Sequence, residues 1–136
     1  MVKKFSTITV YKTAIVISLM LVTPLWILPY VDYLWLTEKE LSVLGWSGYG
    51  AMVEVSAVAY WCLYGIIVLN MVGLYFLKNM ARNVFALFVF SSIFSPALWG
   101  FTVATPLEAA VSFSIAVLYG VLLTLSFTKP LTDQFK

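Results

Sequence analysis

The sequence predicts an all-α integral membrane protein, a single antiparallel bundle of four transmembrane helices that covers residues 1–136. Hydrophobic residues make up 62% of the chain and charged residues only 10%, and the mean hydropathy of +0.99 is far above that of soluble domains. Apolar stretches about 20 residues long recur, which is the length that crosses a hydrocarbon core of roughly 30 Å. They lack the alternation of barrel strands, so helices are expected.

The first span is expected at about residues 13–31. Lysines precede it, as they do in a secretory signal, but Pro24, Trp26 and Pro29 occupy the region where a cleavage site requires small residues. An uncleaved span is therefore predicted. Because Pro24 removes one backbone hydrogen bond, it is expected to kink the helix in its outer half.

The connection at 32–50 is expected to contain a short outer helix. Thr37 followed by Glu40 has the spacing of a capping box, and three glycines loosen the chain before the next span. The main apolar side chains of this segment are Trp35, Leu41, Leu44 and Trp46. The segment is expected to lie along the outer interface or to cover the end of the bundle, and a surface for a partner is the alternative.

The second span is expected at about residues 51–77 and the third at about 84–104. Asn70 must satisfy its amide in hydrocarbon and should therefore face another helix, and Gly65 permits a close helix contact. Pro96 is expected to kink the third span, with three serine hydroxyls close to the break.

The fourth span is expected at about residues 106–127. In "TPLE", Thr105 is placed to cap the helix, Pro106 to occupy its first position, and Glu108 to bond back to the cap. Small or hydroxylated residues then recur at every fourth position: Ser112, Ala116, Gly120 and Thr124. This face indicates a seam for helix packing or for a partner, although a water-lined path would use the same residue types.

Charge sets the expected orientation. Seven of the eight lysines and arginines lie on one side of the predicted spans and only Lys39 lies on the other, so both termini are expected in the cytoplasm. Tryptophans gather at the opposite, outer ends of the spans, as interfacial rings do. The expected location is the bacterial inner (plasma) membrane, which the chain crosses several times.

Three carboxylates near the outer ends are candidates for a cation or proton site: Asp32, Glu54 and Glu108. Glu54 lies a turn inside its span, where an ionised group needs water or a partner. It either snorkels outward or shares a site with Glu108. The alternative for Glu108 is purely structural, because a carboxylate three residues after a cap stabilises the start of a helix.

Catalysis is the least favoured class of function. The chain has no histidine, no Cys-x-x-Cys pair and no paired intramembrane aspartates, so we expect neither an enzyme nor a metal or cofactor site. Nothing in the composition indicates a nucleic-acid partner.

Two non-enzymatic functions remain. The first is a small accessory subunit or immunity-type binding protein that acts by lateral helix–helix contact. The second is a small homo-oligomeric channel or transporter with an acidic outer mouth that attracts cations. The first is preferred because the central parts of the spans hold no ionisable site of the kind that coupled transport uses. The expected partners are the lipid bilayer and either further copies of the chain or another membrane protein.

Overall fold

The computed structural model describes residues 6–53, 56–100, 102–129 and 131–136, and these residues form helices and no strand. The α-helices are α1 (Thr7–Val31), α2 (Glu38–Leu44), α3 (Ala57–Tyr75), α4 (Asn79–Ser92), α5 (Ser95–Trp99) and α6 (Pro106–Phe127). Two short 3₁₀ helices accompany them, η1 (Asp32–Leu34) and η2 (Thr132–Gln134). Within the described ranges, α1, α3 and α6 are long and apolar enough to cross a membrane.

Local capping chemistry sets where several helices begin. Thr105 and Thr37 each head a capping box, at the start of α6 and α2 respectively, as their spacing predicts. The Ser56 hydroxyl accepts the Ala59 N–H at 3.2 Å at the start of α3. The helix expected at 106–127 has those bounds, α1 begins earlier than expected, and α3 is shorter at both ends than the expected span. α1 continues through Pro24, where the expected kink stays a prediction.

The third predicted span is not a single helix, and this expectation was wrong. α4 ends at Ser92, residues 93 and 94 form a turn, and α5 is a separate short helix with Pro96 in its first turn. The physical reason is that Pro96 has no N–H to donate to the Ser92 carbonyl. That carbonyl instead accepts the Ser95 hydroxyl at 2.8 Å. Pro96 therefore marks a helix break rather than a kink.

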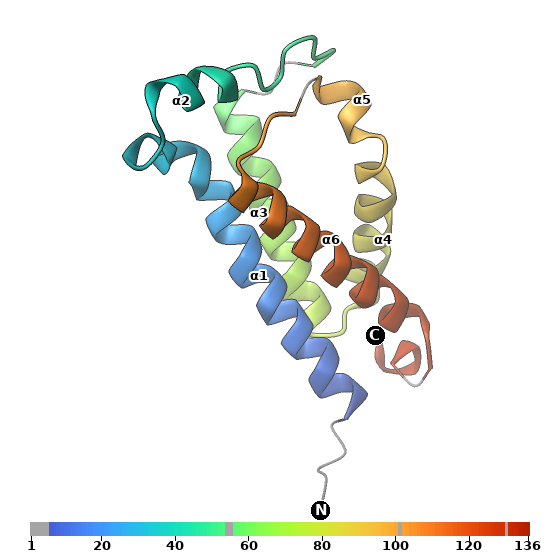
Figure 1. Ribbon diagram of the computed structural model, residues 1–136. Coiled ribbons are helices and arrows are strands. Elements are labelled where there is room, and N and C mark those ends of the chain that lie inside the picture. Colours follow the sequence, from blue (N-terminus) through green and yellow to red (C-terminus); the bar gives the residue numbers. More distant parts are fainter. Residues whose placement is uncertain (1–5, 54–55, 101, 130) are drawn as a thin grey trace, which may run out of the picture.

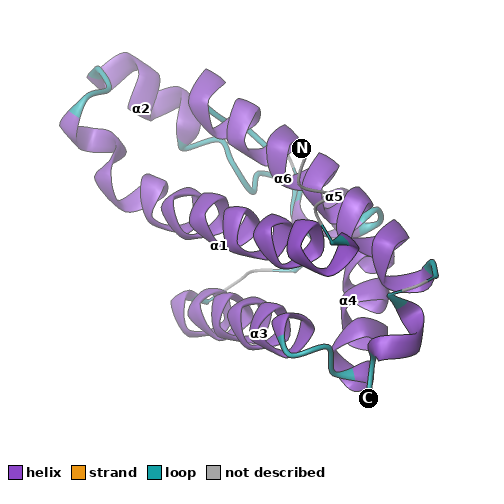
Figure 2. Cartoon of the chain, turned by 90° about the horizontal axis from the view of Figure 1, so that it is seen from below, coloured by secondary structure: helices purple, strands orange, loops and turns teal. Residues whose placement is uncertain are grey.

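The long helices run between two ends of the molecule (Figure 1). The basal end holds the start of α1, the turn between α3 and α4, and the C-terminal residue; the α2 end holds α2 and the loops at 46–53 and 102–105. Viewed from below in Figure 2, α1 lies between α3 and α6, with α4 beside them. The helices touch in the cyclic order α1, α3, α4, α6, and α1 packs most extensively on α6.

The buried core is concentrated toward the basal end. Its larger cluster contains Tyr11, Ala14, Ile15, Met71, Leu74, Ala81, Phe85, Leu122 and Leu131, whereas the cluster nearer the α2 end contains only Val22, Ile67 and Ile115. The Ser126 hydroxyl donates to the Leu122 carbonyl at 2.7 Å, so in its 2.8 Å bond with Tyr11 the tyrosine is the donor. This bond joins α1 to α6 inside the core.

At each end of the molecule, two segments of the chain approach each other closely. At the basal end, a Cβ built on Gly73 of α3 would lie 2.6 Å from the Ala81 Cβ of α4, and the Asn79 N–H donates to the Lys136 carbonyl at 2.8 Å. At the α2 end, Gly100 has φ of +75° and its backbone presses against residues 49–51, where a Cβ would collide with main-chain atoms at 2.6 Å. Only glycine satisfies both conditions at Gly100.

The contact between α3 and α4 gives a stability prediction. Gly73→Ala is expected to lower the free energy of unfolding by about 1–3 kcal/mol, because the new methyl group has no room beside Ala81. Gly65→Ala is the matched control in the same helix, since nothing lies within 4 Å of its Cβ position. It is expected to be neutral or to stabilise by up to about 1 kcal/mol.

Unfolding of both variants and the parent in one detergent, followed by circular dichroism, measures this difference. Equal stability of the two variants would contradict the close approach of α3 and α4 at Gly73.

Candidate functional site

The three carboxylates expected at the outer ends have different surroundings. Glu54 lies outside the described residues. Glu108 completes the capping box of α6: its carboxylate accepts the Thr105 N–H at 2.6 Å, and the Thr105 hydroxyl accepts the Glu108 N–H at 3.1 Å. These two bonds are a sufficient structural reason for a carboxylate at this position.

Asp32 is the buried member of this group. Only 5% of its surface is exposed, and its Oδ1 has no hydrogen-bond partner among the described residues. No hydrogen bond joins it to Glu108 among the described residues. No three potential metal-ligating side chains gather anywhere in the described ranges, and the shared site stays a prediction.

The small residues of α6 face outward. Ser112, Ala116, Gly120 and Thr124, which we call the α6 stripe, are all exposed. The buried face of α6 consists of Ile115, Leu122 and Ser126 instead. No described atom lies within 4 Å of a Cβ built on Gly120. The α6 stripe therefore does not pack against the chain's own helices.

The two remaining predicted packing residues lie on α3. The Asn70 side chain donates to the Ala81 carbonyl of α4 at 3.0 Å, so its amide does face another helix. Gly65 faces open space. The glycine that makes the close helix contact is Gly73, which was not predicted from the sequence. The available signal was its position about one turn before the end of an apolar span, close to a short turn and Ala81.

The segment around α2 lies beside the residues that precede α6. Trp35 and Trp46 are exposed, and Leu41 and Leu44 are half-buried. The Ser47 hydroxyl ties the loop after α2 to the segment before α6, donating to the Val103 carbonyl at 2.8 Å. At the start of α2, bonds from the Thr37 hydroxyl and N–H hold the pKa of Glu40 below its ordinary value.

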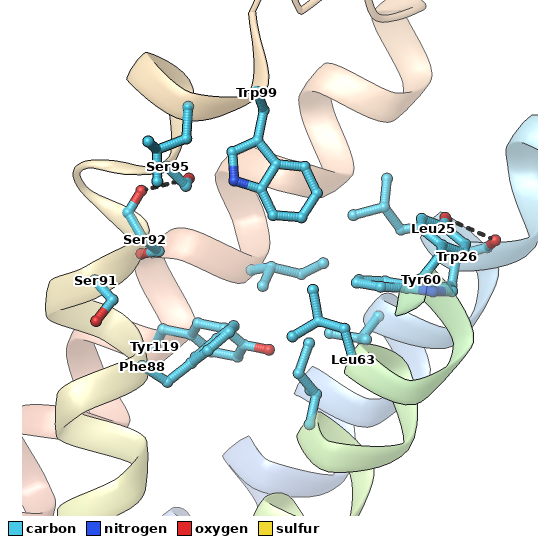
Figure 3. Close-up of a pocket in the computed structure, with 14 residues that line it drawn as sticks. Leu25, Trp26, Tyr60, Leu63, Phe88, Ser91, Ser92, Ser95, Trp99 and Tyr119 are labelled. Carbon is cyan, nitrogen blue, oxygen red and sulfur yellow. Dashed lines mark hydrogen bonds between the residues drawn. The ribbon is translucent and has the colours of Figure 1, made fainter. Parts of the chain in front are cut away.

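A cavity of about 500 Å³ lies between α1, α3, α6 and the α4–α5 segment, toward the α2 end (Figure 3). Every wall contributes an aromatic side chain to its lining: Trp26, Tyr60, Phe88, Trp99 and Tyr119. None of the described residues that line it is charged. The cavity is present because the core is thin here and the helix that would close it ends at Ser92.

Most hydroxyl groups of the lining already donate within the chain. Ser92 donates to the Val89 carbonyl at 2.7 Å, Ser95 to the Ser92 carbonyl, and Tyr60 to the Trp26 carbonyl at 3.2 Å. Tyr119 differs: its ring packs edge-to-face on Phe85 and Phe88, and its hydroxyl points into the cavity (Figure 3). Among the described residues it has no hydrogen-bond partner.

Sequence reasoning did not find this cavity. Its residues come from four separated stretches, and the aromatic ones follow no pattern that distinguishes a lining from a lipid-facing surface. Pro96, preceded by serines at 91, 92 and 95, was the one local signal, because it interrupts the backbone hydrogen bonding of the third span.

The α6 stripe and the cavity are the two features that lie where a second molecule could bind. The stripe is an outward helix face, and the cavity is an uncharged hollow among the helices. Comparisons of the chain with protein-family models, with curated proteins and with solved structures found no match. The geometry of the two features is therefore the basis for the proposals that follow.

The role of Glu108 can be tested by two substitutions. Glu108→Gln keeps an acceptor that can reach the Thr105 N–H, and it is expected to preserve most of the stability of the parent. Glu108→Ala removes the acceptor and is expected to cost about 0.5–2 kcal/mol of unfolding free energy. Both are measured by the same detergent unfolding. Equal losses in the two variants would show that the position requires the charge rather than the capping bonds.

Proposed function

We propose that the protein is a non-enzymatic integral membrane protein that acts by lateral helix–helix contact with another membrane protein, as an accessory subunit or an immunity-type binding protein. The observation that supports this most is the outward position of the α6 stripe. The chain's own packing leaves this face of α6 unused, although it carries the residue types that favour close contact between helices.

The shape of the stripe suits a second helix. Ser112, Ala116 and Gly120 form a shallow strip beside the protruding side chain of Phe113, which is 73% exposed. In lipid, helices associate through close van der Waals packing, which small residues permit. The Thr124 hydroxyl already donates to the Gly120 carbonyl at 2.9 Å, so a partner need not satisfy it.

The proposed topology is an antiparallel bundle with four crossings, both termini cytoplasmic, in a bacterial inner membrane. α4 alone has 14 residues and spans about 21 Å, so the third crossing would need α4 and α5 together. The charge pattern supports this orientation: Lys12, Lys78 and Lys136 belong to the basal end, whereas Asp32 and Glu108 belong to the α2 end.

A homo-oligomeric channel or transporter with an acidic outer mouth is the second candidate. Two carboxylates at the α2 end, Asp32 and Glu108, favour it, because Glu108 precedes the α6 stripe on the same helix and would bring its charge to the interface between copies. Such a pair attracts cations without any charge at the bilayer midplane.

Gly120→Leu tests the lateral contact. The added side chain occupies the stripe and is expected to weaken association with the partner about tenfold or more, since overpacking a close contact costs about 1–3 kcal/mol. Val121→Leu is the matched control, an enlargement of the neighbouring residue, which is 42% exposed and lies off the stripe. Native mass spectrometry of each variant, gently extracted from its own host, measures the fraction in complex.

A stoichiometric foreign subunit that is lost in Gly120→Leu and retained in Val121→Leu would support the proposal. A closed homo-oligomer without any foreign subunit would contradict it and favour the channel, in which case Glu108→Gln should reduce cation flux in liposomes.

A further inference from the structure

The cavity between α1, α3, α6 and the α4–α5 segment has no role in the lateral contact proposed above. It lies on the inner side of the helices, whereas the α6 stripe faces outward. Its volume of about 500 Å³ falls within the range of about 300–1,000 Å³ that is usual for small-molecule sites. It therefore calls for a separate explanation.

The lining specifies the charge and shape of a ligand. Because no charged side chain lines the cavity among the described residues, an ionised molecule would lose its hydration without compensation from them. Aromatic rings stand on opposite walls, with Tyr60 and Trp26 from α3 and α1 facing Phe88 and Tyr119 from α4 and α6 (Figure 3). Such walls favour a flat, neutral molecule whose faces pack against rings.

The polar groups specify the chemistry further. Tyr119 directs into the cavity a hydroxyl that makes no hydrogen bond among the described residues, whereas the unpartnered indole N–H of Trp26 is buried in the wall and out of a ligand's reach. The serine hydroxyls of the lining at 92 and 95 are already used as donors. A ligand with a carbonyl oxygen would accept the free Tyr119 hydroxyl as its hydrogen-bond donor.

The depth of Tyr119 in the bilayer distinguishes between two kinds of membrane-soluble ligand. Tyr119 follows Pro106 by 13 residues, which places it about 20 Å along α6 from the start of the helix. The ester carbonyls of a phospholipid stay at the interface, whereas the hydrocarbon core is about 30 Å thick. A phospholipid chain could fill the cavity but could not bring its carbonyl to Tyr119. A molecule that dissolves wholly in the hydrocarbon and carries its carbonyl on a ring could do so.

We propose that this cavity binds a neutral, planar, bilayer-soluble molecule with a ring carbonyl, the chemistry of a quinone head group, and that the Tyr119 hydroxyl donates a hydrogen bond to that carbonyl. The ligand reaches the cavity through the bilayer, since the walls are the apolar helices themselves. The aromatic side chains hold the ring by stacking. No chemical change of the ligand is part of the proposal.

The test uses the full chain in nanodiscs of a single synthetic phospholipid without quinone. Decylubiquinone is titrated in, and quenching of tryptophan fluorescence is followed, with the linear quenching caused by partition into the bilayer subtracted. Trp26 and Trp99 line the cavity, so a bound ring is expected to give saturable quenching. Tyr119→Phe is expected to raise the dissociation constant about fivefold, which corresponds to about 1 kcal/mol for one hydrogen bond.

Tyr75→Phe is the matched control, because it removes a hydroxyl from the basal end of α3, away from the cavity, and leaves every tryptophan in place. It should bind decylubiquinone as the parent does. Leu63→Phe, which adds volume to the wall, is expected to abolish the saturable component and serves as a second variant if Tyr119→Phe does not fold.

Three results would overturn the proposal. The first is quenching that rises linearly without saturation in the parent protein. The second is equal affinity in the parent and the folded Tyr119→Phe and Leu63→Phe variants. The third is a stoichiometric phospholipid, detected by native mass spectrometry, that decylubiquinone does not displace, which would assign the cavity to an acyl chain. None of these results bears on the lateral contact, which the Gly120→Leu comparison tests separately.

Discussion

Pro96 has no amide hydrogen, and much of the structure follows from the hydrogen bond that it cannot make to Ser92. α4 ends there, and the Ser95 hydroxyl takes the Ser92 carbonyl that a continuing helix would have bonded. The chain then turns into α5 and reaches Gly100, whose left-handed conformation lets it press against residues 49–51. A backbone among apolar helices has to satisfy its polar groups locally, and here a serine side chain does so at the break.

The helices are consequently packed tightly at one end and loosely at the other. At the basal end, Gly73 lets α3 approach Ala81 of α4, Tyr11 bonds Ser126 across α1 and α6, and the Lys136 carbonyl accepts the first N–H of α4. Toward the α2 end the same helices are separated by an uncharged cavity. Most of the buried core thus lies in one half of this small bundle, and the cavity lies in the other.

α6 contributes to both halves and also presents an outward face. One side of the helix supplies Ile115 and Leu122 to the core, and Tyr119, close to this side, reaches into the cavity. The other side carries the α6 stripe, and no described atom lies within 4 Å of a Cβ built on its Gly120. A lateral partner and a small ligand could therefore be bound at the same time without competing for the same side chains. The cavity also lies within the membrane-crossing part of the proposed topology, so its ligand and the partner would both arrive through the bilayer.

The sequence by itself determined the features that depend on a few neighbouring residues. The apolar lengths of the helices, the two capping boxes and the bounds of α6 could be predicted because helix length and end chemistry are local properties. Pro96 indicated that the helix is interrupted, and a kink was expected where the structure has a break. The sequence does not show whether neighbouring packing will hold a helix together past a proline.

Only the tertiary structure decided which faces are buried. From the sequence alone, the α6 stripe could equally have packed inside the bundle, and Gly65 could have made the close helix contact instead of Gly73. The packing of α1, α3 and α4, which turns one face of each helix inward, decides between these possibilities. The cavity likewise depends on distances among four helices whose lining residues are up to about a hundred positions apart. Such distances are set by the sizes of side chains that meet across helices, and no pattern along a single helix records them.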